Sequence, residues 1–239
     1  MNFIPKKKEP VVSEDTSAND KLVISSKDKE KSERAFKIFE SSIRRAENLL
    51  SIDIGPSNEK LEISIDKILD SYRAVIVLSI SALDAYVKTF LIVEIKQRLE
   101  ERNLSVELKK YIKDELFSKD TLHQCVLDND FFEKVIEKFD DDFEKKSFQG
   151  QKSIDKYMKL AGFDQVFKMI ADSADKSPNN LQRDLEIYTQ RRHLIVHCGD
   201  HNLSQTELTE SKISKKEADN CIGLVRFIAS EIHKLSQAK

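Results

Sequence analysis

The chain has 239 residues, of which 34% are charged and 39% hydrophobic, so its length and composition suit one large or two small soluble domains. Five glycines and four prolines are few for this length, because the two residue types together average about 12% of soluble chains. All-β sandwiches and glycine-rich nucleotide folds need more turn formers than this, so the composition predicts an all-α protein. A net charge of −2 excludes a broad basic surface that coats nucleic acid, but it allows a local phosphate site.

Residues 1–28 hold two of the prolines and a Lys6–Lys8 run, and they show neither a helical nor a strand period. We predict a disordered polar tail there. The tail lacks the apolar stretch of a secretory signal, and the three cysteines have no paired spacing. We therefore expect a cytoplasmic protein with reduced thiols.

Apolar residues three and four apart predict a helix over 29–52, which Gly55-Pro56 would end, and a second helix over 57–102. The segment 74–95 is apolar enough to resemble a membrane span. Asp84 and Lys88 interrupt it, however, and each would cost about 2.5–3.5 kcal/mol at the centre of a bilayer. We expect this segment to be the central helix of a bundle, with no membrane contact.

Shorter amphipathic pieces follow near 105–117, 119–127, 129–146, 153–160 and 165–173. We interpret 105–173 as an insertion of short helices into a single domain that spans 29–239. Two more long helices are predicted at 180–198, with Gly199 just past the end, and at 214–237, where Ser214 and Glu217 match a capping box.

The strongest concentration of chemistry is RRHLIVHCGDH, residues 191–201, which holds three of the five histidines. One interpretation is an ordinary helix end, whose basic residues favour the carbonyl terminus. A second is a zinc site, in which His193 and His197 share a helix face and Cys198 or His201 completes the set. Against zinc, the sequence shows no second ligand pair of normal spacing, and His123 and Cys125 are isolated.

A third interpretation is metal-free cleavage of RNA. Histidine can take the proton from a 2′-hydroxyl, and the planar guanidinium of arginine can hold the scissile phosphate. Arg192 and His197 lie about 140° apart around an ideal helix. A long arginine side chain or a second protomer must therefore bring the two groups together.

These strings resemble the HEPN domain superfamily and, within it, the RiboL-PSP type. Arg192 through His197 fits the Rx₄₋₆H signature, and RRHLIVHCGD is similar to the RRNxIVHxGD string of that branch. Residues 81–87, SALDAYV, and the segment that begins at Lys159 also resemble it. The likeness covers roughly residues 33–235.

The resemblance implies an antiparallel helical bundle that forms a homodimer, with a metal-independent endoribonuclease site at the interface and no cofactor. It implies Arg192 and His197 as the catalytic pair, and toxin or antiviral-defence settings in which an inhibitor or defence-system protein is a partner. His193 stands where the family often has Asn, and Asp84 matches an acidic residue of the second string. A carboxylate in so apolar a helix needs a partner, and we predict an Arg or His of the motif in that role.

The expected reaction is attack of the 2′-hydroxyl, giving a 2′,3′-cyclic phosphate and a 5′-hydroxyl. His197 acts as the general base or orients one, and Arg192, assisted by Arg191, holds the phosphate. The small net charge predicts weak binding to bulk RNA and selection of exposed single-stranded loops. Tyr86, Tyr188 and Phe163 are candidates for stacking on a base.

Two other functions remain open. One is a catalytically silent HEPN-like module for dimerisation or for sensing RNA or nucleotides. The other is the HEPN partner of a nucleotidyltransferase in a toxin–antitoxin pair. That second role usually needs a tyrosine just after the motif histidine, where this chain has Cys198 and Gly199.

Overall fold

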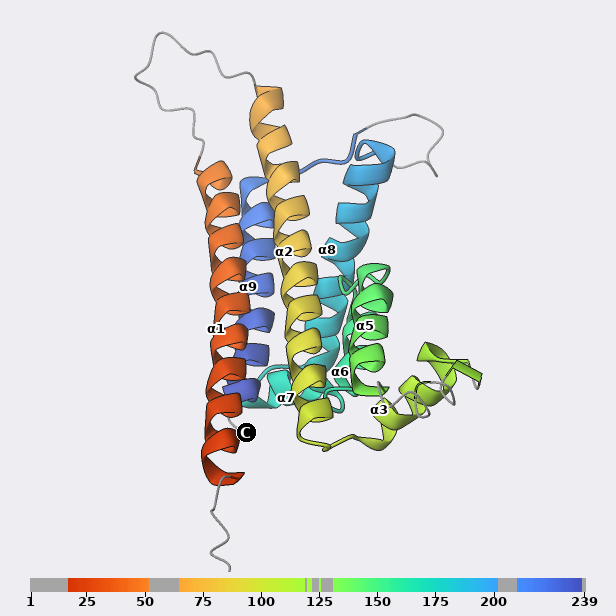
Figure 1. The fold of residues 1–239 in the computed structure, drawn as a ribbon. Helices are drawn as coiled ribbons and strands as arrows, with labels where there is room; N and C mark the ends of the chain where they lie inside the picture. Colours follow the sequence, from red (N-terminus) through yellow and green to blue (C-terminus); the bar gives the residue numbers. More distant parts are fainter. Residues whose placement is uncertain are drawn as a thin grey trace, which may run out of the picture.

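The chain folds into long helices, as the composition predicted (Figure 1). The structure is a computed structural model that describes residues 17–51, 65–118, 120–121, 125, 131–201 and 210–237. Within these ranges, side chains are described from residue 30 onward, with the exception of residue 31. These ranges contain no sheet strand, and one isolated bridge joins His201 to Glu210. The elements are α1 (Ser17–Leu50), α2 (Ile65–Glu100), α3 (Val106–Tyr111), the π-helical η1 (Ile112–Leu116), α5 (Phe131–Glu144), α6 (Gln151–Met158), α7 (Val166–Ser173), α8 (Pro178–Cys198) and α9 (Lys215–Gln237).

Helices α1, α2 and α9 pack side by side along most of their length, and α1 runs opposite to the other two (Figure 1). The predicted stripe of α1 provides its contact face, since Phe39, Ile43 and Ala46 are buried. In α9 the Glu217 N–H donates to Ser214 Oγ at 3.2 Å, which confirms the predicted cap.

Helix α2 is the centre of the bundle, because α1, α5, α6, α8 and α9 all contact it. It is long and apolar enough to cross a membrane, but 56% of that apolar window is buried inside the protein. Core helices of soluble proteins have the same property, so the predicted central position of this segment is confirmed.

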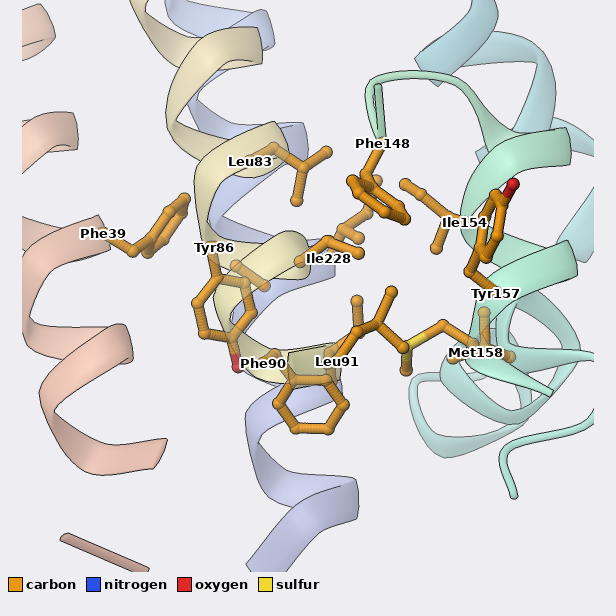
Figure 2. Packing of buried hydrophobic residues seen from close by; sticks show 14 of the residues in the cluster. Phe39, Leu83, Tyr86, Phe90, Leu91, Phe148, Ile154, Tyr157, Met158 and Ile228 are labelled. Carbon is orange, nitrogen blue, oxygen red and sulfur yellow. The ribbon is translucent and has the colours of Figure 1, made fainter. Parts of the chain in front are cut away.

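The short helices between α2 and α8 contribute to the same core rather than covering it from outside. Figure 2 shows Phe148 and Ile154 pointing toward α2, which carries Leu83 and Leu91, and Tyr157 packs against Phe148. Burying such side chains contributes about 1.5–3 kcal/mol each, so this region fixes the lower half of α2 and the start of α8.

Most helix bounds agree with the predicted ranges to within a few residues, but α1 begins at Ser17 instead of 29. Residues 17–28 contain no proline or glycine, and a helix that is already nucleated extends at little cost through such a stretch. The predicted tail is therefore too long. The Lys6–Lys8 run, Gly55-Pro56 and His123 lie outside the described residues.

Helix α8 is held mainly through its N-terminal half, where Leu181 and Leu185 are its buried residues. Its C-terminal half leans away from α2 in Figure 1. Ile187 and Val196 of α8 are 53% and 46% exposed, respectively. The residues that resemble the HEPN signature thus lie on a lightly covered helix end.

Candidate functional site

The signature helix stops at Gly199, which takes the left-handed conformation with φ 56° and ψ 32°. Asp200 follows with φ 64°. The N–H groups of both residues donate to the Leu194 carbonyl, that of Asp200 at 3.0 Å, which closes the end of the helix. The predicted stop at Gly199 is confirmed, and the turn sends Asp200 back into the protein.

Asp200 is the centre of a buried ion cluster. Its carboxylate has no exposed area, and Oδ2 accepts 2.8 Å bonds from Arg191 Nη2 and from Arg73 Nε. Arg191 Nη2 also donates to the carbonyls of Ser211 and Lys212. The cluster joins the end of α8 to α2 and to the segment that precedes α9.

Arg73 extends this cluster to the surface. Its Nη1 atom lies 3.1 Å from Asp70 Oδ1, and its Nη2 atom lies 2.9 Å from Glu210 Oε2. Burial lowers the pKa of Arg73, but the hydrogen bonds to Asp200 and Asp70 outweigh it and raise the pKa above its ordinary value. Nothing in the local sequence around Arg73 marked it as part of the site.

The two adjacent arginines of the signature have different surroundings. The Arg191 guanidinium is bound inside the cluster, so it holds the helix end and is not free to bind phosphate in the described arrangement. Arg192 makes no hydrogen bond or ion pair with the described residues, and its Nε is buried without a partner. Arg191 Nε is also buried without a partner, so the two residues differ in their Nη groups: Nη2 of Arg191 is bound in the cluster, whereas the Nη groups of Arg192 make no hydrogen bond with the described residues and could bind an anion.

His193 and His197 lie beside each other on the exposed face of α8. Their ring centroids are 4.5 Å apart at an interplanar angle of 43°, as expected for residues four apart on a helix. The side chains of Arg192 and His197 leave a regular helix about 140° apart. Because α8 is continuous through Cys198, one protomer does not place them on the same face.

Asp84 has a partner, but not the predicted one. Its carboxylate accepts from the Phe148 N–H and, at 3.4 Å, from Gln149 Nε2. The Gln149 carbonyl in turn accepts from Thr189 Oγ1 of α8 at 3.0 Å. The predicted Arg or His partner of Asp84 is therefore wrong, and this carboxylate instead joins α2 to the segment that rests on α8.

Two of the three proposed stacking residues are in the core. Tyr86 and Phe163 are each 2% exposed, so no base reaches them without unfolding. Tyr188 is partly exposed and lines a groove between α8 and α9.

Cys125, Cys198 and Cys221 are unpaired. In the described ranges, no three His, Cys, Asp or Glu side chains are placed to hold a metal ion.

An apolar groove of about 490 Å³ lies between α2 and the C-terminal end of α8. Ala74, Val77 and Leu78 of α2 and Ile195 of α8 form its apolar wall, and Arg73 lies at its edge. Leu78 is 39% exposed. The groove and the exposed Leu78 therefore give the end of α8 a small apolar surface beside the ion cluster.

Comparison with known proteins gives one family match. Searches of curated proteins and of solved structures give no match. A sequence model of the RiboL-PSP-HEPN family matches residues 39–234, which include all of α2, α8 and the residues of the ion cluster. The chain therefore belongs to the RiboL-PSP-HEPN family.

Proposed function

We propose that this protein is a metal-independent endoribonuclease of the HEPN type that cuts single-stranded RNA in a cleft between two protomers. The observation that carries the proposal is that two neighbouring arginines differ in their bonding partners. Arg191 is held by Asp200, whereas Arg192 has no hydrogen-bond or ion-pair partner among the described residues and precedes an exposed histidine pair in the sequence. Family membership supports the same chemistry.

A homodimer would supply what one protomer lacks. Two copies of α8 that face each other can bring Arg192 of one protomer to His197 of the other, although the pair diverges by about 140° within one helix. The groove between α2 and α8 and the exposed Val196 offer apolar surface beside the site for such an interface.

In this reaction neutral His197 takes the proton of the 2′-hydroxyl, and the 2′-oxygen forms a bond to phosphorus. The bond from phosphorus to the 5′-oxygen breaks, and an imidazolium of the second protomer gives that oxygen its proton. The products are a 2′,3′-cyclic phosphate and a 5′-hydroxyl. The Arg192 guanidinium binds the charge that develops on the phosphate oxygens.

The cellular setting that we propose, a toxin or antiviral-defence effector in the cytoplasm with an inhibitor or defence-system partner, follows from the family alone. Because the net charge is only −2, we expect weak binding to bulk RNA and a preference for unpaired loops.

The second candidate is a catalytically silent module for dimerisation or RNA sensing. The divergence of Arg192 and His197 in one protomer favours it if the dimer leaves these two side chains apart. A cleavage assay separates the two candidates.

The assay incubates the protein with mixed cellular RNA in excess EDTA, beside the Arg192→Ala/His197→Ala double variant. We expect fragments that end in cyclic phosphate from the parent alone. The same fragments from both proteins would refute the assignment. A parent that stays dimeric by light scattering and cuts nothing would favour the silent module.

A further inference from the structure

The face of α8 that carries the histidine pair continues as a polar stripe toward the start of the helix. At about 100° per residue, Asn179, Arg183, Glu186, His193 and His197 fall within an arc of about 80°. None of these five is buried. The stripe ends in a groove of about 330 Å³ where α8 meets α6, lined by Gln151, Lys152, Asn179, Gln182, Arg183 and Glu186.

We infer that this groove binds a nucleotide of the same RNA strand whose cleavage occurs at the histidines. The inference rests on the proposed function and adds to it a second contact, distant from the cut, that would select the substrate. Every side chain that lines the groove is polar or charged, which suits a phosphate and a base edge and does not suit an apolar ligand.

The two cations that line the groove are not bound to buried carboxylates. Lys152 is exposed and makes no ion pair with any side chain in the described ranges. Arg183 lies 3.3 Å from Asp184, but its side chain is 67% exposed, so water screens this pair strongly. A phosphate therefore meets two positive groups that are not neutralised by buried carboxylates.

The remaining groups of the groove match the edge of a base. Gln151 and Asn179 present amides, and Glu186 Oε1 accepts from Gln190 at 2.9 Å, which leaves Oε2 for an incoming donor. Amide groups pair with base edges, and a carboxylate accepts from exocyclic amino groups. The Glu186 carboxylate also repels phosphate, which places the backbone of the strand toward Lys152 and Arg183.

The distance along the helix sets the length of RNA required. From Arg183 to His197, α8 rises about 21 Å at about 1.5 Å per residue. A stacked strand advances about 3.4 Å per nucleotide, so about six nucleotides connect the groove with the histidines. A stacked RNA of four nucleotides is too short to reach both.

Binding is measured by fluorescence anisotropy with labelled single-stranded RNAs of twelve and four nucleotides, over a range of salt concentrations. All proteins carry His197→Ala, so that the RNA stays intact. The test variant is Lys152→Ala/Arg183→Ala. The matched control is Lys109→Ala/Lys113→Ala, which removes the same charge from exposed positions of α3 and η1.

For the twelve-nucleotide RNA, we expect the test variant to lower the slope of log affinity against log salt by about 1.4, which is about tenfold in Kd at 0.15 M salt. The control should stay within about twofold of the parent, and the four-nucleotide RNA, which cannot occupy the groove and the histidines together, should bind the parent more weakly than the twelve-nucleotide RNA does. Equal slopes for test and control, or no RNA binding at all, would overturn the inference.

Cleavage by the protein with His197 restored tests the proposed function separately. If it cuts RNA while the slopes are equal, the endoribonuclease stands and the second contact is wrong. If the slope falls by the expected amount but no RNA is ever cut, the groove is a binding site and the endoribonuclease is wrong.

Discussion

Replacing Asp200 with Asn tests whether the ion cluster holds the end of the signature helix. Asn keeps the shape and one acceptor oxygen but removes the charge that Arg73 and Arg191 share. The two arginine side chains are only 12% and 15% exposed, so water cannot replace the lost carboxylate. Removing one partner of a buried ion pair costs about 3–5 kcal/mol.

We expect the lower end of that range, about 3 kcal/mol, because Arg73 keeps Asp70 and Glu210 as partners. For a chain of this size the loss corresponds to a fall in Tm of about 6–12 °C. Thermal unfolding followed by circular dichroism measures it. Asp219→Asn, at an exposed position of α9, is the matched control and should change the free energy of unfolding by less than about 0.5 kcal/mol.

A second variant tests whether the lost stability of Asp200→Asn comes from unpaired charge or from altered packing. Adding Arg191→Gln to Asp200→Asn removes the cation that has lost its only carboxylate partner, so the double variant should recover part of the lost stability. If Asp200→Asn melts within about 2 °C of the parent, the cluster does not hold the helix end and the reasoning is wrong.

Three further predictions concern other contacts. Gly199→Ala places a side chain at φ 56°, which should cost about 1–2 kcal/mol in a urea titration; no loss would show that the helix end rearranges. Asp84→Ala leaves the Phe148 N–H without its acceptor, so we expect a loss of about 1–3 kcal/mol and faster hydrogen exchange at that amide. The hydrogen bond from Arg226 lowers the pKa of Glu47, so this pair stabilises the fold above about pH 4.3 and the contribution is lost as the pH falls through the lowered value. Arg226→Gln should therefore cost about 0.2–1 kcal/mol at pH 7 and less as the pH falls through the lowered pKa of Glu47, and a cost that does not change with pH would contradict the assignment.

The helices were predictable because their signals are local. Apolar spacing, the stop at Gly199 and the cap at Ser214 each depend on a few neighbouring residues, and the structure has them where the sequence indicates. The start of α1 was misplaced because residues 17–28 carry no marked stripe, and helix extension needs none. The π-helical turn of η1 had no sequence signal that we recognised.

The partner of Asp84 was predicted wrongly for a geometric reason. Arg73 lies level with the end of α8, since it binds Asp200 there. Asp84 is about 16 Å further along α2 at about 1.5 Å per residue, which places it beside Phe148 and away from the signature arginines. The resemblance to the family identified Asp84 as a candidate but did not give its position along the axis of the bundle.

The sequence by itself determined an all-α chain, a central helix over 74–95 and a short string with Arg192 and His197 as the candidate pair. Only the tertiary structure decided which arginine is bound and which is unpartnered, because that depends on Asp200, brought inward by two left-handed residues. It also decided that Arg73, 127 positions from Asp200, belongs to the site. Local sequence encodes helices, whereas a buried charge finds its partners only when distant segments pack and exclude water.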